Sequence, residues 1–148
     1  MPRLETEPRD ADSAATRQGV EELFRRLLQS GQLQGFPKHP RELDVVLAVA
    51  AVGLTRRWPY PEWEINEALA GWLASVRADI DHVTLRRRMV DFGFLKRRPD
   101  GSVYFLNYGR VAEVLGDPAV EVDTAAILAD ILRERGARRR AYVKGTFG

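Results

Sequence analysis

Cysteine is absent from the sequence, and histidine occurs only twice, as His39 and His82. Without cysteine no disulfide can form, and a structural zinc ion would lack thiolate ligands. The two histidines are too few and too far apart to indicate a metal cluster. We therefore predict no metal site and no cofactor.

The motifs of common enzyme classes are missing as well. The sequence has no nucleophile elbow, no phosphate loop and no glycine-rich dinucleotide fingerprint. Glu62, Glu64 and Glu67 lie close together, but ordinary helix surface explains them. We predict no catalytic residue and no enzymatic activity.

Long apolar runs are also missing. The longest, Val45 to Leu54, is about half of what a bilayer crossing requires. The first residues, MPRLETEPRDAD, are polar and acidic, unlike a secretory signal. We expect a cytoplasmic protein that does not enter a membrane.

Charge is distributed unevenly along the chain, although the formal net charge is only +2. Residues 1–12 contain two arginines and four acids, which gives −2. Residues 86–98 contain six basic groups against Asp91, and residues 133–148 contain six against Glu134, which gives +5 in each region. Two basic regions on a nearly neutral chain fit a polyanionic partner.

Apolar residues at helical spacing predict five helices. These are expected at about Thr16–Gln29, Pro40–Gly53, Pro61–Ala74, Asp79 or Asp81 to near Gly93, and Thr124–Arg135 with Gly136 as its end. Shorter pieces are expected as an extended stretch at Gln32–Gln34, a strand or turn at Tyr60, and a turn of helix at Val111–Leu115. A hairpin should pair Phe94–Arg98 with Val103–Leu106 through the turn Pro99-Asp100-Gly101-Ser102.

The predicted fold is mainly α with a small β-hairpin: a winged helix-turn-helix core with additional N-terminal and C-terminal helices. A basic helix followed by a basic hairpin is what such a module needs, because the helix enters a groove and the wing holds phosphate. The chain divides into a disordered acidic N-terminus (1–15), an N-terminal helix and connector (16–35), the winged-helix domain (36–108), a C-terminal helical extension (109–136) and a mobile basic tail (137–148).

Three stretches resemble a bacterial family, the domain of unknown function 2087: GFPKHPRELDVVLAVAA, YPEWEINEAL and DHVTLRRRMVDFGFLKRRPDGSVYF. They match its proline-lysine start at Pro37-Lys38, its apolar helix from Leu43, its Tyr60–Glu67 segment and its Thr84–Leu95 segment, so the resemblance covers about residues 22–106. The resemblance implies a winged-helix fold, often found beside regulator domains of the arsenic-repressor type, and no assigned activity. The chain departs from the family in lacking a separate repressor domain, in having Arg88 where relatives often carry an acid, and in its C-terminal helix and basic tail.

The helical wheel of the fourth helix separates its side chains. Leu85, Met89, Phe92 and His82 should be buried, Arg86 half-buried, and Thr84, Arg87 and Asp91 exposed, with Arg88 between the two faces. We expect Arg86 to pair with a carboxylate or with helix-end carbonyls, and Asn66 to make a hydrogen bond between helices. Trp58, Tyr60, Trp63 and Trp72 should seal the core rather than stack on bases, with Trp63 the one that is exposed.

The candidate DNA-binding residues are those on the outer face of the helix, on the first hairpin strand and in the tail: Thr84, Arg87, Arg88, Lys96, Arg97, Arg98, Arg138, Arg139 and Arg140. Simpler interpretations also hold: Arg87 could pair with Asp91 on a solvated helix surface, and the hairpin cations could discourage strand aggregation. The sequence thus favours a DNA-binding winged-helix protein that acts in transcription. The alternatives are a protein-interaction module, with a possible homodimer through the terminal helices, and an RNA-binding module.

Overall fold

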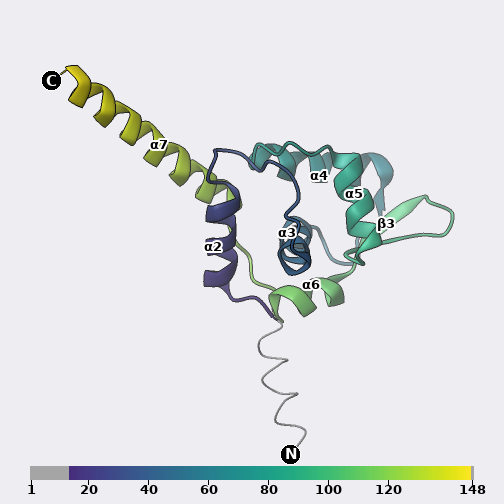
Figure 1. Cartoon of the computed structure of the whole chain (residues 1–148). Helices are drawn as coiled ribbons and strands as arrows, with labels where there is room; N and C mark the ends of the chain where they lie inside the picture. Colours follow the sequence, from purple (N-terminus) through teal and green to yellow (C-terminus); the bar gives the residue numbers. More distant parts are fainter. Residues whose placement is uncertain (1–13, 148) are drawn as a thin grey trace, which may run out of the picture.

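The computed structural model describes residues 14–147, with side chains as far as Lys144. Along these residues the elements are α2 (Arg17–Leu27), α3 (Pro40–Val52), β1 (Tyr60–Pro61), α4 (Glu62–Ser75), α5 (His82–Asp91), β2 (Leu95–Arg97), β3 (Val103–Leu106), α6 (Tyr108–Leu115) and α7 (Thr124–Phe147) (Figure 1). The protein is therefore mainly helical with a small antiparallel sheet. The disorder that we expected for residues 1–15 concerns residues that, up to residue 13, lie outside the described part.

Local sequence signals set the starts of the helices. Thr16 caps α2, where its hydroxyl oxygen accepts a hydrogen bond from the backbone N–H of Gly19 at 3.0 Å. His39 caps α3 through Nδ1, which accepts from the backbone N–H of Arg41 at 3.2 Å, and Pro40 occupies the first helical position, where no donor is needed. The predicted positions of α2, α3, α4 and α5 are confirmed to within a few residues.

The sheet has three strands in the order β1-β3-β2. β2 and β3 form the predicted hairpin, with Leu95 opposite Leu106 and Arg97 opposite Tyr104, and this hairpin is called the wing below. Tyr60 lies opposite Tyr104 from the other side, so β1 is a true strand. The order α3-β1-α4-α5-β2-β3 is compatible with a winged helix-turn-helix.

The core is built around α3, which lies at the centre of the molecule with α2, α5 and α6 around it (Figure 1). Val46, Leu47, Ala48 and Ala51 of α3 are fully buried, as an apolar helix covered on all sides requires. The core also includes residues of α2 and α7, so these helices belong to the same folding unit.

The largest side chain of α2 shows how that helix docks. Phe24 is fully buried, and its ring meets the ring of Trp72 in α4 edge to face, with the centroids 6.4 Å apart. Leu33, in the connector after α2, accepts a hydrogen bond from the backbone N–H of Asp79 at 2.8 Å and donates one to the carbonyl of Val76 at 3.1 Å. The expected extended stretch at Gln32–Gln34 is thus fixed by backbone bonds, although no strand is assigned there.

The end of the last helix was predicted wrongly. We expected Gly136 to end a helix at Arg135 and the tail to be mobile, whereas α7 continues through Gly136 to Phe147. One glycine inside a helix costs only about 1 kcal/mol relative to alanine, and the following Ala137–Ala141 stretch consists of strong helix formers. Likewise α6 begins at Tyr108 instead of Val111, because Asn107 caps it by accepting from the backbone N–H of Arg110 at 3.4 Å.

No helix in the described part of the chain is long and apolar enough to cross a membrane. α7 is long, but its second half is rich in arginine. The face that it buries belongs to its first half, where Ile127, Leu128 and Ile131 pack in the core. Residues 136–144 are called distal α7 below, and they project away from the body (Figure 1).

The packing of α2 gives a first prediction. Phe24→Ala should lower the free energy of unfolding by about 3–5 kcal/mol, because it leaves a cavity between α2 and α4. Denaturant unfolding of Phe92→Ala is the control, since Phe92 is 40% exposed and its truncation should cost clearly less than that of the fully buried Phe24. Equal effects of the two substitutions would contradict a core that includes α2.

Candidate nucleic-acid interface

The residues that α5 buries determine which of its side chains face the solvent. Leu85 and Met89 are fully buried, which turns Thr84, Arg87 and Asp91 to solvent as the wheel predicted. Val83 lies on the same exposed side. The outer face therefore carries an apolar group, a hydroxyl, a cation and an acid.

Phe92 is a correction to the wheel, because it was predicted to be buried and is 40% exposed. α5 ends at Asp91, and Phe92 is its C-terminal cap with a non-helical ψ of 7°. Helical periodicity no longer places the side chain at such a position. His82, expected on the buried face, is only partly buried.

The Asp81 carboxylate fixes the N-terminus of α5. Its Oδ1 accepts a hydrogen bond from the backbone N–H of Thr84 at 2.7 Å. This bond, and a second from the Thr84 side chain, hold the pKa of Asp81 below its usual value of 3.8. The hydroxyl of Thr84 is thus partly engaged inside the helix cap.

Arg86 and Arg97 meet at one ring. Arg86 donates from Nη1 to Oδ1 of Asn66 in α4, and its guanidinium lies 5.4 Å from the centroid of the Tyr104 ring. The guanidinium of Arg97, from the wing, lies 5.8 Å from the same centroid. These contacts of Asn66, Arg86, Arg97 and Tyr104 join α4, α5 and the wing. The partner of Arg86 is a side-chain amide oxygen, whereas we expected a carboxylate or the carbonyls at a helix end.

The other two arginines of α5 differ in their surroundings. Arg88 is partly buried, and its guanidinium lies 4.9 Å from the ring centroid of Phe36 in the connector before α3. Arg87 is exposed, and within residues 14–147 it makes none of the ion pairs, so the surface pair with Asp91 is not formed. Arg87 is the more available of the two.

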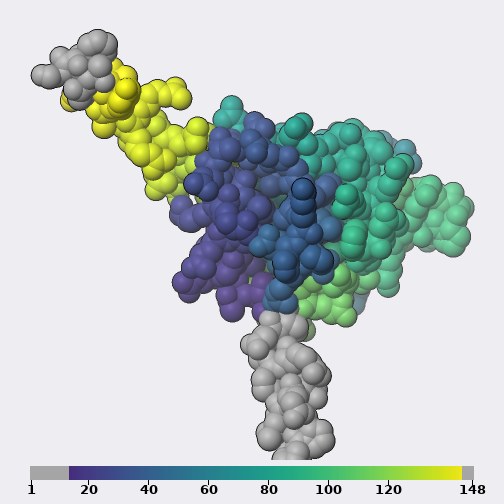
Figure 2. Space-filling model, viewed as in Figure 1, coloured from purple at the N-terminus to yellow at the C-terminus, as the bar shows by residue number. Residues whose placement is uncertain are grey.

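The wing carries three exposed cations, Lys96, Arg97 and Arg98. Figure 2 shows the wing as a protrusion at the right of the molecule. Asp100 stabilises the turn of the wing, because Oδ1 accepts from the backbone N–H of Ser102 at 2.9 Å and from its hydroxyl at 2.7 Å. These two bonds, with a smaller contribution from Arg98, lower the pKa of Asp100. Gly101 supplies the positive φ of 77° that the turn requires.

The tail arginines lie elsewhere. Arg138, Arg139 and Arg140 are exposed on distal α7, at the opposite end of the molecule from the wing (Figures 1 and 2). The structure brings Arg87 and Lys96–Arg98 to one end and does not bring the tail cations to them.

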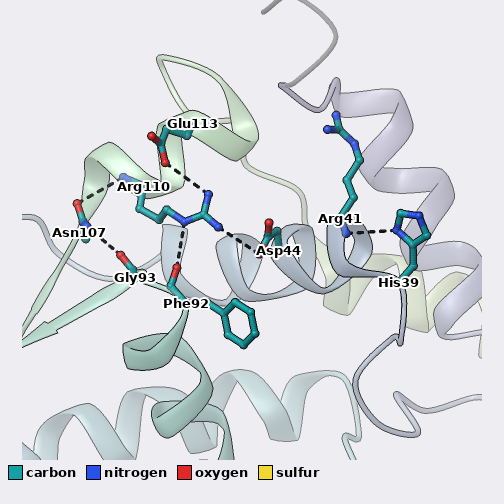
Figure 3. A network of polar contacts seen from close by, with 8 residues as sticks. All are labelled: His39, Arg41, Asp44, Phe92, Gly93, Asn107, Arg110 and Glu113. Carbon is teal, nitrogen blue, oxygen red and sulfur yellow. Dashed lines mark hydrogen bonds and ion pairs between the residues drawn. The ribbon is translucent and has the colours of Figure 1, made fainter. Parts of the chain in front are cut away.

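Sequence reasoning missed Arg110, although it links the C-terminal end of α5, close to the wing, to the central helix α3 (Figure 3). Its Nε–H donates to the carbonyl of Phe92 at 3.0 Å, Nη2 lies 3.2 Å from Oδ1 of Asp44 in α3, and Nη1 lies 3.4 Å from Oε1 of Glu113. The guanidinium also covers the Phe94 ring at 4.6 Å. The signal in the sequence was Asp44, an acid next to the apolar stretch Val45–Val52 of α3, where a cationic partner is favourable.

The contacts of Arg110 with Phe92, Asp44 and Glu113 are called the joint below, and Asn107 adds to them. Its Nδ2 donates to the carbonyl of Gly93 at 2.8 Å, while its oxygen caps α6. Gly93 has a φ of 86°, which lets the chain turn sharply from α5 into β2. No group of three metal-binding side chains occurs among the described residues.

The cap of α5 predicts a pH dependence. Because the folded-state pKa of Asp81 is lowered, its carboxylate stabilises the protein above the unfolded value of 3.8, and this contribution is lost as the pH falls through the lower folded value. Asp81→Asn should melt below the wild type at neutral pH, and the difference should shrink in acid below 3.8. A difference in melting temperature that stays constant with pH would refute the role of the charge.

The joint at Arg110 gives a third prediction. Arg110→Lys should lower the free energy of unfolding by about 1–3 kcal/mol, since one ammonium group cannot serve the Phe92 carbonyl and two carboxylates in this geometry. The control is Arg133→Lys, which alters an exposed pair with Asp130 and should change the value by less than about 0.5 kcal/mol. If the two variants had equal free energies of unfolding in denaturant, the contacts of the Arg110 guanidinium would not be needed for stability.

One family model, described as "Uncharacterized protein conserved in bacteria (DUF2087)", matches residues 32–106. The match starts later than the resemblance over residues 22–106 that the sequence motifs indicated, and it leaves out α2, α6 and α7. Comparisons with curated proteins and with solved structures found no match. Because the matched segment is just over half of the chain, the protein belongs to this bacterial family of uncharacterized proteins.

Proposed function

We propose that the protein binds duplex DNA through α5 and the wing, and that it acts in the regulation of transcription. The observation that carries this proposal is the arrangement at one end of the molecule: an exposed helix face with Thr84 and Arg87 beside a protruding hairpin with three exposed cations. A helix of this kind fits the major groove of B-form DNA, and a basic hairpin beside it can hold the phosphate backbone.

The residues divide into two roles. Arg87 and Thr84 lie nearest to the bases, and arginine can bind the guanine edge with two hydrogen bonds. Lys96, Arg97 and Arg98 hold phosphates. Arg88 is a weaker candidate than sequence reasoning suggested, because its guanidinium packs on Phe36.

The distribution of charge supports a larger contribution of the wing than of α5 to the affinity for DNA. On the outer face of α5, Arg87 is offset by Asp91, so this face has little net charge. The wing has three cations against Asp100 alone. Phosphate binding should therefore depend mainly on the wing, while α5 contributes discrimination between bases, including acceptance by Asp91 from the amino group of cytosine.

Duplex DNA fits this surface better than duplex RNA. The major groove of A-form RNA is deep and narrow, so that it does not admit a helix such as α5. An exposed helix face with a protruding hairpin beside it (Figure 1) matches a wide groove and its flanking backbone.

A protein-interaction module is the second candidate, and the exposed tryptophans favour it. Trp63 is 66% exposed, as expected. Trp58, just before α4, was expected to seal the core, but it is 48% exposed and donates from Nε1 to Oε2 of Glu64 at 3.1 Å. Dimerisation through the terminal helices has less support, because the apolar residues of α2 and of the first half of α7 pack in the chain's own core. A protein partner would therefore contact the tryptophans in preference to those helices.

The salt dependence of DNA binding separates the two candidates. The wild type should bind duplex DNA with an affinity that falls steeply as salt is raised, with a slope of about 0.9 per neutralised phosphate on logarithmic axes. Lys96→Gln/Arg98→Gln should lower that slope by about 1.8 with little change in the melting temperature, because both side chains are exposed and neither contacts the Tyr104 ring. Fluorescence anisotropy at several salt concentrations measures the slope.

The matched control removes two exposed cations outside the wing, Lys38→Gln/Arg57→Gln, and should leave the slope unchanged. If the control and the wing variant lose the same amount, binding follows total charge and the wing has no special role. If the wild type does not bind duplex DNA at all, the protein-interaction candidate takes precedence.

A further inference from the structure

Distal α7 is the most strongly charged element that the DNA surface at the other end does not use. Residues 136–144, GARRRAYVK, contain Arg138, Arg139, Arg140 and Lys144 and no acid. All four cations are exposed. Just before this segment, Nη1 of Arg135 donates to the carbonyl of Gln29 at 3.1 Å.

The four cations surround the helix instead of forming a stripe. With about 100° between successive residues, Arg138, Arg139 and Arg140 point in three different directions, Lys144 lies on the same side as Arg140, and Tyr142 and Val143 fall between the arginines. A coiled coil or a membrane-surface helix requires a continuous apolar face, which distal α7 lacks. Two copies of this segment would also repel each other, because neither has an acid.

Like charges four residues apart also destabilise an isolated helix, and short isolated helices are marginal in water. A polyanion that neutralises the cations would relieve this repulsion. A nucleic-acid backbone supplies that charge, because it presents a dense row of phosphates that cationic side chains can neutralise.

The position of distal α7 decides which DNA it reaches. The wing and distal α7 extend from opposite ends of the molecule, with α2, α3 and α6 between them (Figures 1 and 2). A duplex seated on α5 and the wing lies at the far end from Arg138–Arg140. The tail cations are therefore far from the phosphates of that duplex.

We propose that distal α7 binds the phosphate backbone of a second duplex segment, so that one protein molecule bridges two segments of DNA. This inference rests on the proposed DNA binding by α5 and the wing. The first segment is read by α5 and held by the wing, and the second is held through charge alone, without base recognition.

A bridging assay with the full-length chain tests this proposal. One duplex is fixed to a surface, the protein is added, and capture of a second, fluorescent duplex is measured. The wild type should capture the second duplex. Arg138→Gln/Arg139→Gln/Arg140→Gln should still bind the fixed duplex but reduce capture by about tenfold, because glutamine preserves helix propensity and removes the charge.

Lys38→Gln/Arg57→Gln is again the control and should capture the second duplex as well as the wild type does. Unchanged melting temperatures confirm that each variant is folded, and sedimentation shows whether the bridging species holds one protein molecule. Binding of the fixed duplex without capture of the second would overturn the bridging proposal alone. Capture that survives loss of the three arginines would overturn it too. Failure to bind the fixed duplex would overturn the DNA-binding function with it.

Discussion

The guanidinium of Arg110 determines how α5 and the wing are presented. Its planar fork bonds at once to the Phe92 carbonyl at the end of α5 and to Asp44 in the central helix α3. A cation at the C-terminus of a helix is also favoured by the helix dipole. Because β2 starts directly after this point, the same contacts set the direction of the hairpin. The end of the molecule that we assign to DNA is thereby fixed to the core.

The folding unit is larger than the segment that defines the family. The family match covers residues 32–106, whereas α2 contributes the buried Phe24, α6 contributes Arg110 and α7 contributes Ile131. The added elements therefore support the matched segment from outside and leave the outer face of α5 and the wing exposed. In distal α7 they also extend beyond the body, where no other described element covers them.

Much of the fold was predictable because its signals are local. Helical spacing of apolar residues located α2 to α5, and Asp81 and Gly93 marked the two ends of α5. The errors arose where a local signal was outweighed or absent. Gly136 reads as a helix stop, yet strong helix formers follow it, and Phe92 lies one residue past the end of its helix. The partners of Arg110 are distant in the chain, so no periodicity could identify them.

The candidate site was predictable to a similar degree. The sequence identified Arg87, since its exposure follows from helix periodicity, and it identified the wing cations by their charge. All three wing cations are exposed, although strand alternation alone would turn neighbouring residues to opposite faces. It did not show that Arg88 packs on Phe36, or that Arg86 and Arg97 share the Tyr104 ring. Nor could it show that the tail lies at the other end of the molecule, because that depends on how α7 packs against α2.

Titration of isotope-labelled protein with duplex DNA, followed by amide chemical shifts in NMR, tests the central claim most directly. The account predicts that the largest shifts fall on the outer face of α5, around Thr84 and Arg87, and on the wing from Lys96 to Ser102. Shifts in α2 and α3 should remain small. Large shifts around Trp63, with α5 and the wing unaffected, would contradict the account.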